Sequence, residues 1–257
     1  MDTQLDTDSI LKAKYQRLRQ RQAKTPPMAV LRLAEMQTPP LPLFNVVTDP
    51  RQVWILGQVT YNDVYDPVAA TLRYKRAGVD GIAFYTDDRV YDNGLEDLLL
   101  VCRGGKLPVF YQNYILDDYH VAEARAAGAS AIILYSAVLD AHMLRRTVSV
   151  TQRWRMASVV QVENIHQLDD VQTLSPHVIC VGDSRRFDTD YDLALLGEVR
   201  EQIPRFTHVM LLGCLREMQH VHAALDLGVD ALILDETLLG SAAAMREIHS
   251  RIERVTV

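Results

Sequence analysis

One pattern recurs along the chain at multiples of 25 residues, and it limits the folds that the chain can adopt. The segments Ala77–Phe84, Ala127–Leu134 and Leu227–Leu234 each contain a glycine near the start, then a polar residue and a short apolar run. Their glycines are 50 and 100 residues apart. A helix that ends at the glycine and a buried strand that follows it would explain each copy. The sequence therefore predicts repeated strand–helix units of about 25 residues, long enough for one parallel crossover.

Apolar runs fall where this repeat places strands, and most are continuous, as in parallel strands covered on both faces. The predicted strands are Val53–Val59, Gly81–Thr86, Leu107–Tyr111, Ala131–Tyr135, Ser158–Val162, His177–Val181, His208–Leu212 and Ala231–Leu234. Helical patterns lie between them, for example over Pro67–Ala77 and Asp118–Ala127. Alternating strands and helices predict an α/β fold, and eight units favour a closed (β/α)8 TIM barrel over an open sheet. We expect this barrel over residues 46–257.

Residues 1–45 are predicted to form an N-terminal helical extension. The first 24 residues hold six basic and three acidic residues, a net charge of +3. Since the whole chain carries −6, the remaining residues carry −9. We expect a helix that begins with Asp8 or Ser9 as its N-cap and ends before Pro26, with its charges in solvent. Its buried stripe is predicted to be Ile10, Leu11, Tyr15 and Leu18. A second short helix is expected around residues 28–36.

The composition excludes several classes of protein. Hydrophobic residues make up 48% and charged residues 23%, which is typical of a globular chain. We expect no membrane span, no signal peptide and no nucleic-acid partner, because no apolar run is long enough, the first ten residues are acidic and the net charge is negative. The separated cysteines Cys102, Cys180 and Cys214 indicate a reducing compartment. The sequence therefore predicts a cytoplasmic protein.

In such a barrel the chemistry lies at the carboxyl ends of the strands. No GxGxxG follows the first predicted strand and no GxxxxGK[ST] is present, so nucleotide-binding motifs give no support to a cofactor, and we expect none. The strand ends carry mainly amide, phenol and carboxylate side chains. These are Gln58, Thr60, Tyr85, Asp87, Gln112, Tyr114, Ser136, Gln161, Glu163, Asp183, Arg185, Gly213, Cys214, Asp235 and Glu236.

Several segments resemble indole-3-glycerol phosphate synthases. Residues 114–129, YILDDYHVAEARAAGA, are similar to that family's F-I-I-D-x-Y-Q-x-x-E-A-R-x-x-G-A stretch, which is the most specific match. Thr86-Asp87 and then GLEDL over residues 94–98 resemble its L-T-D-x-x-x-F-x-G-S-L-x-D-L, and FDTDYDL over 187–193 resembles its K-T-F-x-V-D-L. The resemblance spans essentially the whole chain and implies a TIM barrel with an extra N-terminal helix.

The resemblance also implies a decarboxylating ring closure of a carboxyphenylamino-deoxyribulose phosphate, but the residues that it maps to this reaction are replaced. The family's first-strand Glu and Lys correspond to Gln58 and Thr60, its third-strand Lys to Gln112 and its fifth-strand Glu to Gln161. Its sixth-strand N-N-R-N corresponds to residues 182–185, beginning at Gly182, and Asp235 stands where the phosphate clamp has glycine. An amide cannot exchange a proton near neutral pH. We call the end of the barrel at the carboxyl ends of the strands the mouth. We therefore expect the mouth to hold no mobile protons and to have no affinity for a phosphate.

Three functions remain open from the sequence. The first is a catalytically silent family member that binds a neutral or cationic small molecule, or a protein partner. The second is a barrel enzyme with changed chemistry, which would use Cys214 or a carboxylate cluster of Glu163, Asp183 and Asp235 beside Glu236; we expect no metal there. The third is a working synthase. The predicted ligand-binding residues are Tyr85, Tyr114, Glu163, Asp183, Ser184, Arg185, Leu211, Gly213, Cys214, Asp235 and Glu236.

Overall fold

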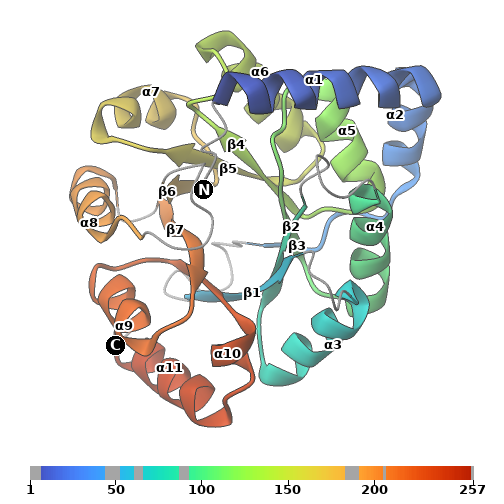
Figure 1. Ribbon diagram of the computed structural model, residues 1–257. Helices are drawn as coiled ribbons and strands as arrows, with labels where there is room; N and C mark the ends of the chain where they lie inside the picture. The colour runs from blue at the N-terminus through green and yellow to red at the C-terminus, as the bar shows by residue number, and fades with distance from the viewer. Residues whose placement is uncertain are drawn as a thin grey trace.

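The chain folds into a closed barrel of eight parallel strands surrounded by helices (Figure 1). The structure, a computed structural model, describes residues 7–43, 53–60, 66–86, 93–182, 191–204 and 207–255. The strands are β1 Trp54–Thr60, β2 Gly81–Tyr85, β3 Val109–Gln112, β4 Ala131–Tyr135, β5 Ala157–Val162, β6 Val178–Val181, β7 His208–Leu215 and β8 Ala231–Leu234. They pair in chain order, and β1 pairs with β8 to close the ring. The predicted (β/α)8 barrel is confirmed.

Helices surround the barrel and connect successive strands. They are α3 Pro67–Ala77, α4 Gly94–Gly105, α5 Asp118–Ala127, α6 Ala141–Arg153, α7 Leu168–Thr173, α8 Leu193–Gln202, α9 Met218–Asp226, α10 Glu236–Leu239 and α11 Ala242–Val255, with a 3-10 turn, η1, over Ile165–Gln167. Within the described ranges, no helix combines the length and the apolar character that a membrane crossing requires.

Local signals explain the bounds of α3 and α5, which agree with the prediction. Asp66 and Asp117 cap the two helices by accepting hydrogen bonds from the backbone N–H groups of Ala69 and His120. Both helices end at a glycine in the left-handed conformation. Each boundary is therefore set by residues within one turn of the helix end. Because these residues are close in the sequence, the boundary can be predicted from the sequence alone.

Strand β7 is longer than predicted and irregular. It continues to Leu215 rather than ending at Leu212. Met210 pairs with Ala231 and Cys214 pairs with Ile233, so a four-residue step on β7 matches a two-residue step on β8. The two extra residues leave the alternation unchanged, with Met210, Leu212 and Cys214 inside the barrel and Leu211 and Leu215 outside it. Gly213 and Cys214 consequently lie inside the strand and not after it, which corrects their predicted position.

Two apolar layers form the core. Inside the barrel, alternate strand residues such as Leu56, Phe110 and Ile133 pack against one another. Outside it, the intervening residues, including Phe84 and Leu211, pack between the sheet and the helices. The strands are thus buried on both faces, as their continuous apolar sequences predict.

The N-terminal extension forms two helices, α1 Thr7–Lys24 and α2 Pro27–Met36, and α2 packs along α5. The predicted cap at Asp8 or Ser9 is wrong, because α1 already includes Thr7. Ile10 and Leu18 are buried as expected, but Tyr15 is 45% exposed. The boundary expected between residues 45 and 46 lies outside the described residues.

A glycine in β1 makes a close approach that gives a first testable prediction. A Cβ at Gly57 would lie 2.6 Å from Cδ2 of the buried Tyr74 on α3. We expect Gly57→Ala to lower the free energy of unfolding by about 1–3 kcal/mol, as overpacking typically does. Urea denaturation of the full chain measures this change.

The matched control for Gly57→Ala is Gly197→Ala in the middle of α8. There a Cβ would make only an ordinary contact, 3.4 Å from Leu227 Cδ2. Removing a helical glycine should leave stability unchanged or raise it by about 0.5–1 kcal/mol. Equal destabilisation by the two variants would contradict the packing described for β1 and α3.

Candidate binding site at the barrel mouth

Three glutamines occupy the inner face of the barrel at the carboxyl ends of β1, β3 and β5. Gln58, Gln112 and Gln161 each lie two residues after an inward-facing apolar residue, so they too face inward. The Gln58 amide donates to Gln112 Oε1 at 3.1 Å, across the intervening β2. Gln112 is 2% exposed and Gln161 is fully buried. Gln58 and Gln112 are therefore in contact, and Gln161 faces the same interior from β5.

Gln161 has one hydrogen-bonding atom available. Its Nε2 donates to the carbonyl oxygen of Gly182, at the end of β6. Its Oε1 is buried and has no hydrogen-bond partner within the described ranges. A buried acceptor without a partner costs free energy of about 1–3 kcal/mol, which a ligand or water that donates a hydrogen bond would recover.

Tyrosines line the same end of the barrel near β3 and β4. The rings of Tyr114 and Tyr135 lie 5.1 Å apart between centroids. Complete burial raises the pKa of Tyr135 well above 10, with smaller contributions from Tyr114 and Tyr85. Burial likewise raises the pKa of Cys180, inside β6. Neither group can exchange a proton near neutral pH.

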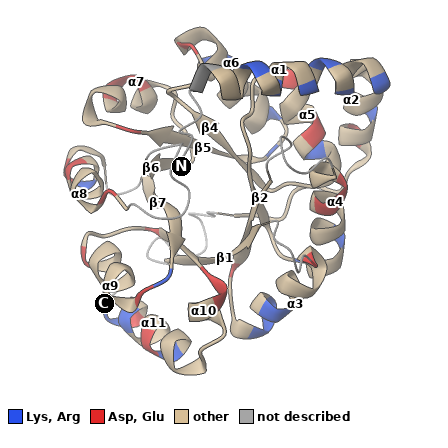
Figure 2. Cartoon of the chain, in the orientation of Figure 1, with Lys and Arg blue, Asp and Glu red and all other residues tan. Residues whose placement is uncertain are grey.

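A lysine from the N-terminal extension reaches this end of the barrel, which the sequence analysis did not foresee. Lys14 of α1 is 1% exposed, although most of the Lys and Arg residues coloured in Figure 2 are on the helices that surround the barrel. Its ammonium donates to Asn113 Oδ1 at 2.8 Å and lies 5.7 Å from the centroid of the Tyr114 ring. The carboxyl end of the barrel therefore holds an ammonium group that the strand residues do not supply.

A helical period in the sequence could have revealed Lys14. Ile10, Lys14 and Leu18 are four residues apart and share one face of α1, and all three are buried. Apolar character alone predicts Tyr15 on this face, and charge alone predicts Lys14 in solvent. A lysine between two buried residues at this spacing is the signal that was missed.

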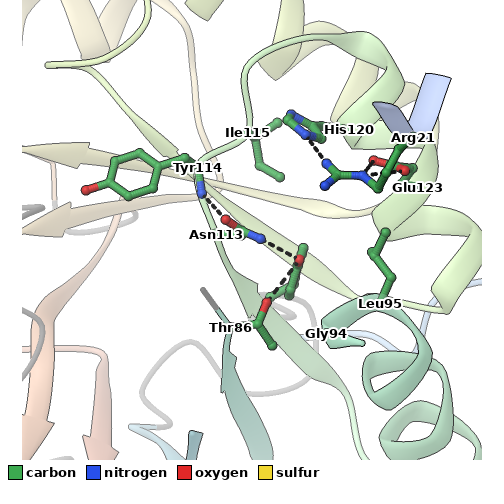
Figure 3. Close-up of a pocket in the computed structure, with 10 residues that line it drawn as sticks. Arg21, Thr86, Gly94, Leu95, Asn113, Tyr114, Ile115, His120 and Glu123 are labelled. Carbon is green, nitrogen blue, oxygen red and sulfur yellow. Dashed lines mark hydrogen bonds and ion pairs between the residues drawn. The ribbon is translucent and has the colours of Figure 1, made fainter. Parts of the chain in front are cut away.

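Polar contacts hold α1 against α5 and the loop before it (Figure 3). Arg21 Nε lies 3.0 Å from Oε1 of Glu123, and Arg21 Nη2 lies 2.5 Å from His120 Nε2. The hydroxyl of Tyr119 donates to the carbonyl oxygen of Thr25 at 3.0 Å. A cavity of about 30 Å³, close to the space of a single water, lies beside Arg21. These contacts fix the position from which Lys14 enters the mouth.

The two carboxylates after β8 are not directed into one cluster. Asp235 Oδ1 accepts from the backbone N–H of Leu238 at 3.1 Å and so caps α10, while Oδ2 lies 3.9 Å from Arg216 Nε. Glu236 is 62% exposed and pairs with Arg73 of α3 at 2.9 Å. Glu236 therefore points to the outer rim, away from the position predicted for a ligand.

The remaining predicted residues are in different environments. Leu211 belongs to the outer apolar layer and does not face the mouth, which corrects its predicted place. Cys214 faces inward and is 5% exposed, Thr60 is exposed, and Tyr85 and Glu163 are half-buried. Asp87, Asp183, Ser184 and Arg185 lie outside the described residues. Their roles stay predictions.

Within the described part of the chain, no group of three His, Cys, Asp or Glu side chains is placed to hold a metal ion. Asp183, which belonged to the carboxylate cluster considered from the sequence, is not among those residues. Glu163 uses its backbone N–H to donate to Gln167 Oε1 at 2.7 Å.

Comparisons with known proteins point to one family. The family described as "Indole-3-glycerol phosphate synthase" matches residues 57–250. Relatives with that name include one from Dehalococcoides mccartyi (strain ATCC BAA-2266), 27% identical and covering 86% of this chain and 92% of its own. Another, from Roseiflexus sp. (strain RS-1), is 26% identical and covers 93% and 94%.

A solved structure is similar in fold alone. Thiamine phosphate pyrophosphorylase from Pyrococcus furiosus has a TM-score of 0.58 and 15% identity, covering 80% of this chain and 98% of its own.

The burial of Lys14 gives a second testable prediction. In the folded chain we expect an amine-acetylating reagent to modify Lys14 at least about ten-fold more slowly than Lys12, because modification requires α1 to open locally. Lys12 is on the same helix and exposed, so it serves as the internal control. Peptide mass spectrometry after brief labelling measures both rates. Equal rates at the two lysines would contradict the position of α1.

Proposed function

Since this chain belongs to the indole-3-glycerol phosphate synthase family, we propose that it has kept the family's barrel without the ring-closing activity and binds a small neutral molecule at the mouth. The observation that carries this proposal is the state of Gln112 and Gln161. Both stand where the family resemblance places an acid/base residue. Both side chains are buried, and each amide forms a hydrogen bond to another protein group. General acid–base catalysis contributes typically ~10²–10⁴-fold per group, and two such groups are replaced together.

The charges at the mouth favour a neutral ligand. At the β8 side, the Asp235 carboxylate accepts a hydrogen bond from the backbone N–H of Leu238 in α10. A phosphate bound at this helix N-terminus would need the same N–H group. At the β3 side, the Lys14 ammonium would repel a cation, which argues against the cationic ligand considered from the sequence. A neutral molecule with a hydroxyl or N–H group could donate to Gln161 Oε1 and stack on Tyr114.

Lys14 favours one alternative, a synthase that works by a different route. The ammonium beside Asn113, one residue after Gln112, is a proton donor at the strand where the family resemblance places the catalytic lysine. In that case the extension, and not β3, would supply the general acid. This alternative leaves the fifth-strand position without an acid/base group, because Gln161 has no proton to exchange.

A turnover assay tests the proposal and separates the alternative. We expect the purified chain to convert the carboxyphenylamino-deoxyribulose phosphate no faster than a mock preparation, as followed by the fluorescence of the indole product. Turnover above the mock rate would overturn the proposal. If Lys14→Gln then removed that turnover and Lys12→Gln kept it, the result would support the alternative, a working synthase whose general acid is Lys14 of α1.

A thermal-shift experiment tests ligand binding. We expect ribitol to raise the melting temperature of the chain more than ribitol 5-phosphate does at the same concentration, because ligand that binds only the folded state stabilises it. Gln161→Leu should remove the shift, and Gln202→Leu, at an exposed position on α8, should keep it. A larger shift with the phosphate ester would contradict the proposed neutral ligand.

A further inference from the structure

A second pocket lies at the opposite end of the barrel from the mouth. Its volume is about 350 Å³, at the lower end of the range for small-molecule sites. It is lined by the linker after α2 (residues 37–41), the end of α4 and the turns that lead into β3 and β4, and we call it the linker pocket. Because it lies where strands begin and the mouth lies where they end, roughly 10–15 Å of strand separates the two.

The linker pocket is positively charged in a chain whose net charge is −6. Arg103 and Lys106 line it, both are exposed, and neither has an ion-pair partner among the described residues. No Asp or Glu is among the residues that line the pocket. Two unneutralised cations on one concave surface attract an anion.

A third positive charge lies behind the wall of this pocket. Arg125 of α5 is 5% exposed, and its Nη2 donates to the carbonyl oxygens of Gln37 and Thr38, at 3.0 and 2.7 Å. Its Nε and Nη1 are buried and have no hydrogen-bond partner in the described part of the chain. The guanidinium stays charged although burial lowers its pKa, so it adds to the positive potential at the linker.

Apolar side chains make up much of the remaining lining, beside the polar Gln37, Thr38 and Ser130. The apolar lining residues include Pro39, Pro40 and Leu41 of the linker, with Leu107 and Ala127. Leu41 is 44% exposed, so its side chain has apolar surface that a ligand can still cover. A ligand that fits this lining has a charged end and a short hydrocarbon body.

We propose that the linker pocket binds a small organic anion, a carboxylate with a short apolar body. The carboxylate interacts with Arg103 and Lys106, and the body covers Leu41 and Leu107. One wall is the linker that follows α2, so an occupied pocket also stabilises the extension against the barrel. This proposal is independent of the function proposed for the mouth.

The test uses hexanoate as the probe and hexanamide as its uncharged match. By calorimetric or NMR titration of the full chain, we expect hexanoate to bind at least about five-fold more tightly than hexanamide. Arg103→Gln combined with Lys106→Gln should weaken hexanoate binding at least about five-fold. The control, Arg76→Gln combined with Arg153→Gln, changes two exposed cations outside the pocket and should leave binding unchanged.

A second variant fills the pocket without touching its charges. Thr38 is exposed and lines the pocket, and its contact with Arg125 is made by the backbone, so Thr38→Trp keeps that contact and should abolish binding. Gln161→Leu, which changes only the mouth, should bind hexanoate as tightly as the unmodified chain. This result separates the linker pocket from the function proposed for the mouth. Unchanged affinity in the Arg103/Lys106 double variant or in Thr38→Trp, or no binding at about 10 mM hexanoate, would overturn the proposal.

Discussion

The pairing of β1 with β8 is the constraint on which the rest of the structure depends. Trp54 pairs with Ala231 and Gly57 with Leu234, and these contacts turn a parallel sheet into a ring with no free edge. Closure gives the strands an interior, where Leu56 of β1 belongs to one apolar cluster with residues from the other strands. It also brings Gln58 within hydrogen-bond distance of Gln112 across a neighbouring strand. Without closure these amides would be solvated side chains on one face of an open sheet.

The N-terminal extension forms part of the mouth because the buried Lys14 ammonium interacts with polar and aromatic groups there. Burying an ammonium in a low-dielectric interior is costly unless polar groups replace its water. For Lys14 these groups include the Asn113 oxygen and the face of the Tyr114 ring, both on the segment after β3. The Arg21–Glu123 ion pair holds the same helix two turns further along. The chemistry of the mouth therefore depends on residues almost a hundred positions apart.

The two ends of the barrel contrast in charge and in hydrogen bonding. At the mouth, amides and phenols are engaged with one another, and Asp235 occupies a helix N-terminus. At the other end, Arg103 and Lys106 have no acidic partner within the described ranges. Helix C-termini explain part of this, because a cation such as Arg103 complements the carbonyl end of α4. The linker adds the concave apolar wall, which a helix terminus alone does not provide.

The sequence by itself determined the barrel and its helices, because periodicity and capping are properties of short segments. Capping residues such as Asp66 and Gly78 act within one helical turn. Only the tertiary structure decided which strand residues face inward. In a strand buried on both faces, Leu211 and Leu212 look alike in the sequence, yet Leu211 packs outside the barrel and Leu212 inside it. It also decided that Lys14 is buried and that Glu236 turns to Arg73, because both depend on partners far away in the chain.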